Sequence, residues 1–147
     1  MAESQDPPTS GVEAHHTGLT VADLDRSIEF YAGLLGCTVE SKFSVSGDAF
    51  GAVVGSDGVS GRFVHLDSGG SRIELVEYEP AASPREPATL PQPGGSHVAF
   101  AVEDVDAFLG GLPGRVDRLS EPRTTDSGTR LVFVRDPDGN LVELLEA

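Results

Sequence analysis

The sequence is poor in lysine and in cysteine. Lys42 is the only lysine, and ten lysines and arginines stand against 24 aspartates and glutamates, which gives a formal net charge of −14 over 147 residues. This excess of negative charge argues against a positively charged surface that could bind nucleic acid or an anionic membrane. Because Cys37 is the only cysteine, the chain cannot form an internal disulfide, which fits a reducing compartment.

Long apolar runs and nucleotide-binding loops are also missing. No stretch is long enough to span a bilayer, the N-terminus lacks the features of a signal peptide, and no glycine-rich phosphate loop is present. We therefore expect a soluble, cytoplasmic protein. The acidic, lysine-poor composition is typical of proteins from salt-loving organisms, in which salt screens self-repulsion. An ordinary acidic bacterial protein is the alternative.

What the sequence does contain is an internal repeat. His97 opens a short alternating run that ends at Val102 and leads into an Asp-x-Asp pair and a helical pattern, and His16 opens a similar run upstream. The two halves also end alike, because Glu74 and Glu143 each stand between aliphatic residues of a strand-like run. The repeat indicates two copies of one supersecondary unit.

Each unit is predicted to have the order β-α-β-β-β. In the first unit we expect strands at 12–21, 37–45, 62–67 and 71–78, with a helix at about 24–35; in the second, strands at 97–102, 116–120, 129–135 and 140–145, with a helix at about 104–112. Residues 1–11 are predicted to be a flexible arm and the proline-rich segment 79–95 a linker. The predicted fold is one α+β domain at 12–147, with units at 12–78 and 96–147.

Strand alternation places four polar side chains opposite apolar faces, and these four converge if the sheets curl. They are His16, Glu74, His97 and Glu143. For any one of them a solvated strand residue is the simpler interpretation, but their joint recurrence favours a shared site. Two imidazoles and two carboxylates without a thiolate suit a catalytic, octahedral first-row metal ion.

Several segments resemble the vicinal oxygen chelate superfamily, which includes glyoxalase I, bleomycin-resistance proteins and extradiol dioxygenases. The resemblance lies in residues 16–21, 25–31, 72–75, 97–100 and 136–144. It implies paired β-α-β-β-β units that form a curled mixed sheet enclosing a metal-binding cup. It also implies one divalent ion, of nickel, cobalt, zinc, manganese or iron, held by His16, Glu74, His97 and Glu143. The ligand order is that of glyoxalase I.

The activity implied is that of a metal-dependent glyoxalase I-like lyase or isomerase. In this chemistry a proton moves between carbons next to a carbonyl, through a metal-stabilised enediolate. We expect Glu143 as the base, with Glu74 as its partner, and a small-molecule substrate, of which a thiol adduct of a 2-oxoaldehyde is one option. The loop at 46–61 and the linker are expected to wall the pocket.

Other interpretations stay open. The same superfamily contains epimerases and iron-dependent extradiol dioxygenases, and a non-catalytic small-molecule binding or resistance protein is a third class. Two functional roles are open for His65, lining the cup or binding iron, but an ordinary strand histidine without a functional role is favoured. Arg72 is a candidate for binding a substrate carboxylate, unless Glu77 or Asp67 pairs with it. A homodimer is expected because sheet edges need cover, and the units pair either within one chain or between two.

Overall fold

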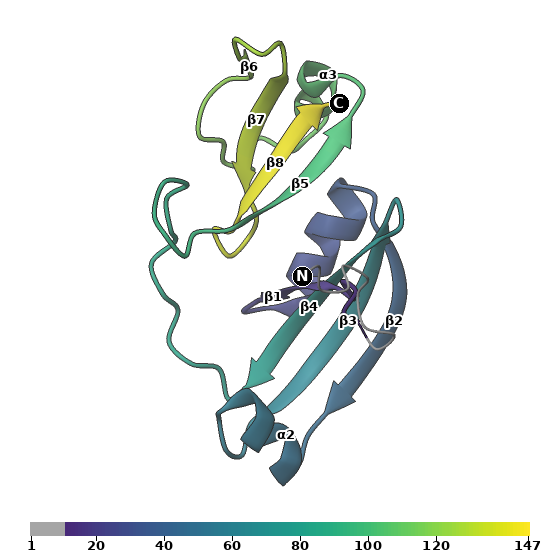
Figure 1. Ribbon diagram of the computed structural model, residues 1–147, viewed down its shortest axis with the longest axis vertical. Helices are drawn as coiled ribbons and strands as arrows, with labels where there is room; N and C mark the ends of the chain where they lie inside the picture. The colour runs from purple at the N-terminus through teal and green to yellow at the C-terminus, as the bar shows by residue number, and fades with distance from the viewer. Residues whose placement is uncertain (1–10) are drawn as a thin grey trace, which may run out of the picture.

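The computed structural model describes residues 11–147, so the predicted arm lies outside the described residues except for Gly11. Two units follow one another along the chain and are joined by an extended linker (Figure 1). The first contains β1 (Thr17–Thr20), α1 (Leu24–Ile28), the π-helix η1 (Glu29–Leu34), β2 (Thr38–Val45), α2 (Asp48–Val54), β3 (Ser60–Ser68) and β4 (Ser71–Glu79). The second contains β5 (His97–Val102), α3 (Val105–Gly110), β6 (Arg123–Thr124), β7 (Arg130–Arg135) and β8 (Leu141–Glu146).

Each unit forms a four-stranded mixed sheet, which confirms the predicted α+β class. The strand orders are β1-β4-β3-β2 and β5-β8-β7-β6. In both sheets the first strand pairs in parallel with the last strand, and the remaining pairs are antiparallel. The first strand of each unit is therefore an edge strand, and it lies directly beside the strand that carries the glutamate of the repeat, Glu74 on β4 or Glu143 on β8.

The helices start in the same way in both units. Asp23 and Asp104 are the N-cap residues of α1 and α3, and each side chain accepts a hydrogen bond from the backbone N–H three residues later. The first N–H of each helix donates to a glutamate on the last strand of its own unit, Glu77 at 2.8 Å and Glu146 at 3.0 Å. These glutamates tie each helix to its sheet.

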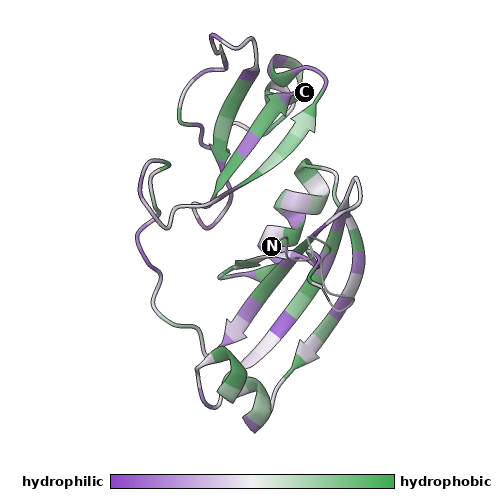
Figure 2. Cartoon of the chain, in the orientation of Figure 1, coloured by the Kyte–Doolittle hydropathy of each residue, from purple (hydrophilic) through white to green (hydrophobic). Residues whose placement is uncertain are grey.

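One hydrophobic core is shared by the two units. Buried side chains of β3, β4, α1 and η1 belong to the same cluster as those of α3, β7 and β8. The rings of Tyr31 and Phe100 lie 6.4 Å apart across the boundary, and the Ala22 backbone N–H donates to Asp138 Oδ1 at 3.0 Å. Apolar and hydrophilic positions alternate along the strands (Figure 2), so the opposite, more polar face of each sheet is directed away from this shared core.

Two predicted strands differ in the structure. The first begins at Thr17 rather than near residue 12, so His16 lies just before β1. The expected strand at 116–120 is reduced to an isolated bridge between Arg118 and Val134, followed by the two-residue β6. Pro122 interrupts this segment because proline has no N–H to donate to a ladder. None of the described helices is long and apolar enough to cross a membrane.

Candidate metal centre

The first histidine–glutamate pair is formed by neighbouring parallel strands. Gly18 of β1 stands opposite Glu74 of β4, which brings His16, two residues before Gly18, onto the same face as Glu74. His16 Nε2 lies 3.4 Å from Glu74 Oε1. The Glu74 side chain is only 15% exposed, so its carboxylate needs partners in the protein.

A third side chain, His65, completes this group from the other side. It stands directly opposite Glu74 in the β3–β4 ladder, and its Nε2 lies 2.8 Å from Glu74 Oε2. The ligand atoms of His16, His65 and Glu74 all lie within 4.8 Å of one another. A signal for His65 was present in the sequence, because a hairpin that turns at Gly69 and Gly70 places it opposite Glu74.

The second pair repeats the first in the other unit. His97 of β5 and Glu143 of β8 lie on adjacent parallel strands, with His97 Nε2 3.2 Å from Glu143 Oε1. Here the residue opposite the glutamate is Phe133, whose ring centroid lies 5.3 Å from that of His97. The second unit therefore offers two candidate ligands where the first offers three.

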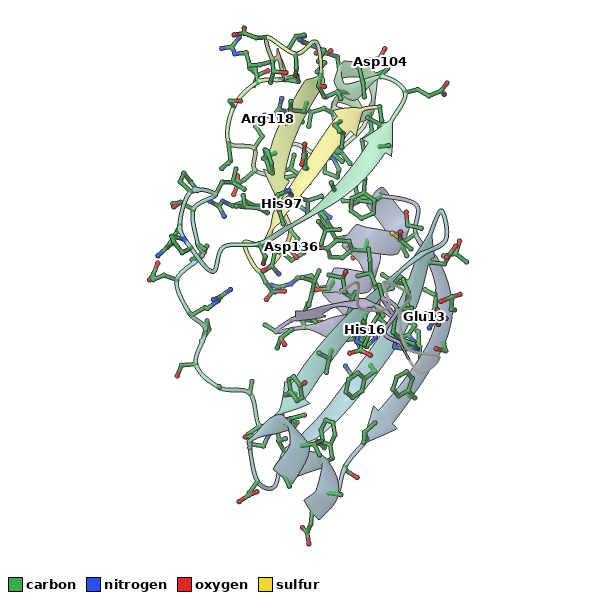
Figure 3. All side chains as sticks on the ribbon, viewed as in Figure 1. Glu13, His16, His97, Asp104, Arg118 and Asp136 are labelled. Carbon is green, nitrogen blue, oxygen red and sulfur yellow. The ribbon has the colours of Figure 1, made fainter. Side chains whose placement is uncertain are left out.

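Within one chain the four predicted ligands form two separate pairs, one in each unit. Among the described residues, the groups of three or more converging ligands are His16–His65–Glu74 and a separate acidic group around Asp106. Figure 3 shows His16 and His97 well apart, on different units. The acidic group already has partners, since Glu146 accepts from the start of α3 and Arg130 binds Asp106 at 2.6 and 3.0 Å.

Both pairs have a spacing that suits a metal ion. Neighbouring ligands at about 2.1 Å from a first-row ion lie roughly 3.0–3.4 Å apart, and the nitrogen–oxygen distances of the two pairs, 3.4 and 3.2 Å, fall in or at the edge of this range. The His65–Glu74 distance of 2.8 Å is that of a hydrogen bond. Neither Glu74 nor Glu143 has a lysine or arginine ion partner within the described chain. A set of imidazoles and carboxylates matches the donors that divalent first-row ions accept together with water.

The surroundings of His16 differ from the expectation of simple alternation. Alternation would put His15 on the opposite face, but its Nδ1 lies 2.8 Å from His16 Nδ1 because both residues precede the paired strand. Arg72 Nη1 lies 3.2 Å from His15 Nε2, and its Nε donates to Glu40 at 3.1 Å. Arg72 thus pairs with Glu40, while Glu77 pairs with Arg62 at 3.0 Å.

An aromatic surface adjoins the three-residue group. The ring of Phe43 lies edge-on to His65 at 5.1 Å and is stacked on Phe63, also at 5.1 Å with an interplanar angle of 3°. Phe63 in turn contacts Phe50 and Tyr78, at 6.0 and 6.4 Å between ring centroids. This surface provides an apolar wall for an organic molecule beside the polar cluster.

A cavity of about 540 Å³ lies beyond the Tyr78 end of these aromatic residues. Tyr78 borders it together with residues of the loop after α2, the linker at 80–88 and the turn at 138–141. The loop and linker line this cavity, and its volume is sufficient for a small organic ligand. None of the candidate metal ligands borders it, so the role of these segments in walling the substrate pocket stays a prediction.

The chain matches a family model described as Glyoxalase/Bleomycin resistance protein/Dioxygenase superfamily over residues 13–144. It is 34% identical to a 2-epi-5-epi-valiolone epimerase from Actinomyces sp., over 91% of this chain and 79% of that protein. It is 30% identical to a probable lactoylglutathione lyase from Vibrio cholerae, over 89% of this chain and 88% of that protein. The crystal structure of a glyoxalase family protein from Bacillus cereus superposes with a TM-score of 0.83 at 24% identity, covering 99% of this chain and 98% of that one. The chain belongs to the Glyoxalase/Bleomycin resistance protein/Dioxygenase superfamily.

Proposed function

We propose that the protein is a metal-dependent glyoxalase I-like lyase or isomerase, which removes a proton from the carbon next to a carbonyl and returns it to the adjacent carbon. The observation that carries the proposal is the recurrence of one histidine–glutamate pair on the same face of both units, at 3.4 and 3.2 Å. Relatives named as lactoylglutathione lyases support this class of chemistry. The substrate is a small molecule, with a thiol adduct of a 2-oxoaldehyde as the first to test.

One divalent ion, of nickel, cobalt, zinc, manganese or iron, is proposed to be held by His16, Glu74, His97 and Glu143. When bound, such an ion supplies Lewis-acid stabilisation of the negative charge that develops on substrate oxygen during proton removal. The aromatic surface beside His65 would exclude water from the substrate and hold its apolar part.

The surroundings of the two glutamates favour Glu143 as the base. Glu74 is held at both oxygens, by His65 at 2.8 Å and by His16 at 3.4 Å. Glu143 has one imidazole partner, His97, at 3.2 Å. A carboxylate with a freer oxygen reorients more readily toward a substrate carbon, so Glu143 would take the proton and return it while Glu74 stays fixed.

We further propose that the complete site is shared by two chains in a homodimer. The two pairs lie on faces directed away from the shared core of one chain, and the four ligands do not converge there. In addition, β1 and β5 are edge strands with one side open within the described chain. A twofold dimer would place the first unit of each chain against the second unit of its partner and form two equivalent sites.

An epimerase is the second candidate, because the chain is 34% identical to a protein with that name. An epimerase uses the same proton removal but returns the proton to the opposite side of the same carbon. Arg72, two residues before Glu74, already contacts Glu40 and His15. Few of its N–H donors are therefore left to bind the carboxylates of a peptide thiol, which a lactoylglutathione lyase would have to recognise.

The test is proton transfer in D2O by metal-loaded protein, followed by NMR with methylglyoxal adducts of several thiols and with cyclic and linear 2-hydroxyketones. A lyase converts the adducts to 2-hydroxyacid thioesters, whereas an epimerase introduces solvent deuterium with inversion. Replacing Glu143→Gln should slow the reaction by about 10²- to 10⁴-fold, the usual contribution of a general base.

The matched control is Glu146→Gln, on the same strand but at the start of α3. It should leave the chemical step unchanged. The proposal fails if the loaded wild-type protein neither converts nor exchanges any of these compounds, or if Glu143→Gln reacts as fast as the wild type.

A further inference from the structure

We propose that His65 is itself a metal ligand, so that His16, His65 and Glu74 form a cation site complete within the first unit of one chain. This inference rests on the metal site of the proposed function. It adds a residue to the four proposed ligands, and it states where the ion binds first.

Geometry and burial carry the first step. His65 Nε2 lies at a hydrogen-bonding distance of 2.8 Å from Glu74 Oε2, so a small rotation of either side chain reaches the spacing of two ligands on one ion, and the His65 side chain is only 13% exposed against 32% for His16. All three ligand atoms converge within 4.8 Å without any residue of the second unit. His65 is therefore as well placed to hold an ion as the histidine that the repeat singles out.

The internal repeat supplies a built-in comparison. Glu74 and Glu143 occupy equivalent positions on β4 and β8, and the residue directly opposite is His65 in the first unit and Phe133 in the second. The two units thus share a histidine–glutamate pair but differ in this third position. Three donors define an open site that holds an ion and leaves positions for water or substrate, whereas two donors bind weakly.

A purely structural role for His65 is the competing explanation. In that case the imidazole only orients Glu74 through a hydrogen bond. Glutamine distinguishes the two roles, because its amide N–H reaches Glu74 as a donor but is a poor ligand for a first-row ion. Phenylalanine removes both functions and reproduces the arrangement found around Glu143.

The experiment measures Co²⁺ binding by equilibrium dialysis and visible absorption in the full chain carrying His97→Ala and Glu143→Ala. We expect this double variant to bind one Co²⁺ per chain through the first unit. Adding His65→Gln or His65→Phe should weaken binding by at least about tenfold, because loss of even a supporting residue costs 10–100-fold. Ser41→Ala, at the position paired with His65 on β2, is the matched control and should bind Co²⁺ like the double variant.

Two results would overturn the inference: a double variant that binds no Co²⁺, or a His65→Gln variant that binds Co²⁺ as tightly as its parent. Circular dichroism and urea unfolding of each variant separate loss of binding from loss of fold. The outcome is independent of catalysis. If the wild type binds Co²⁺ through His65 but transfers no proton, the proposed function fails and this site stands.

Discussion

The most deeply buried polar contact joins the two units through single side chains. Tyr31 and Asp136 are 0% and 5% exposed, and the Tyr31 hydroxyl donates to Asp136 Oδ2 at 2.7 Å. Burial, and secondly the charge of Asp136, raise the pKa of Tyr31 above its ordinary value of 10. The hydroxyl therefore stays protonated at neutral pH and remains a donor.

We expect Tyr31→Phe to lower the free energy of unfolding by about 1.5–3 kcal/mol, the contribution of a hydrogen bond to a charged group. The cost stays in this range because Asp136 also accepts from the Asp138 and Asn140 backbone N–H groups, at 2.9 and 2.8 Å. Urea unfolding measures the change. Tyr78→Phe, on the other face of the first sheet, serves as control, and an equal loss in both variants would contradict the argument.

At the level of residues, the sequence predicted the two histidine–glutamate pairs as candidate ligands but did not favour His65 as a third member of the first group. Recurrence in the repeat was enough to relate His16 to Glu74 and His97 to Glu143, because adjacent parallel strands follow from the unit itself. The position of His65 beside Glu74 depends on the register of the β3–β4 hairpin. The repeat does not reveal this contact, because the equivalent residue of the second unit is Phe133. The grouping of all four predicted ligands into one site stays a prediction.

Among the elements, α1 is held to β4 by Glu77, and this contact makes a pH-dependent contribution to stability. The pKa of Glu77 lies below its ordinary value of 4.5, chiefly because the Leu24 backbone N–H donates to it and also because Arg62 pairs with it. A lowered pKa in the folded state adds stability above pH 4.5, and this stability is lost as pH falls through the folded pKa.

Glu77→Gln tests this contribution, because glutamine keeps an acceptor for α1 but carries no charge. We expect the variant to unfold at lower urea concentration than the wild type at pH 7, and the difference to shrink as the pH is lowered toward 3. Glu103→Gln, at an exposed position, should differ little from the wild type at either pH. A difference for Glu77→Gln that is constant from pH 7 to 3 would contradict the assignment.

Predictions of elements were accurate where a local signal was strong. The β3–β4 hairpin and β5 follow the predicted ranges, and Gly36, with φ of +80°, ends the first helix as expected. The change from α1 to the π-helix η1 was not predictable, because apolar spacing does not distinguish bonds to the fifth residue from bonds to the fourth. The expected strand at 116–120 is reduced to a bridge at Arg118, and Pro122, which has no N–H to donate, separates it from β6.

At the level of the whole molecule, the sequence left the arrangement of the two units open. Both units have a helix-covered face and a polar face, and a linker of this length permits several placements. The structure packs the helix-covered faces into one core, where Tyr31 and Phe100 meet. In the proposed dimer the polar faces of two chains meet, and because each chain carries a net charge of −14, salt should favour this association.

Subunit complementation tests the shared site. One variant carries His16→Ala and Glu74→Ala, and the other carries His97→Ala and Glu143→Ala, so neither homodimer contains a complete set of four ligands. If each site joins the first unit of one chain to the second unit of its partner, every mixed dimer regains one intact site. Unfolding and refolding an equimolar mixture should then restore about one quarter of wild-type proton transfer. Light scattering should show dimers throughout. A mixture that stays inactive while mixed dimers form would exclude the exchanged arrangement.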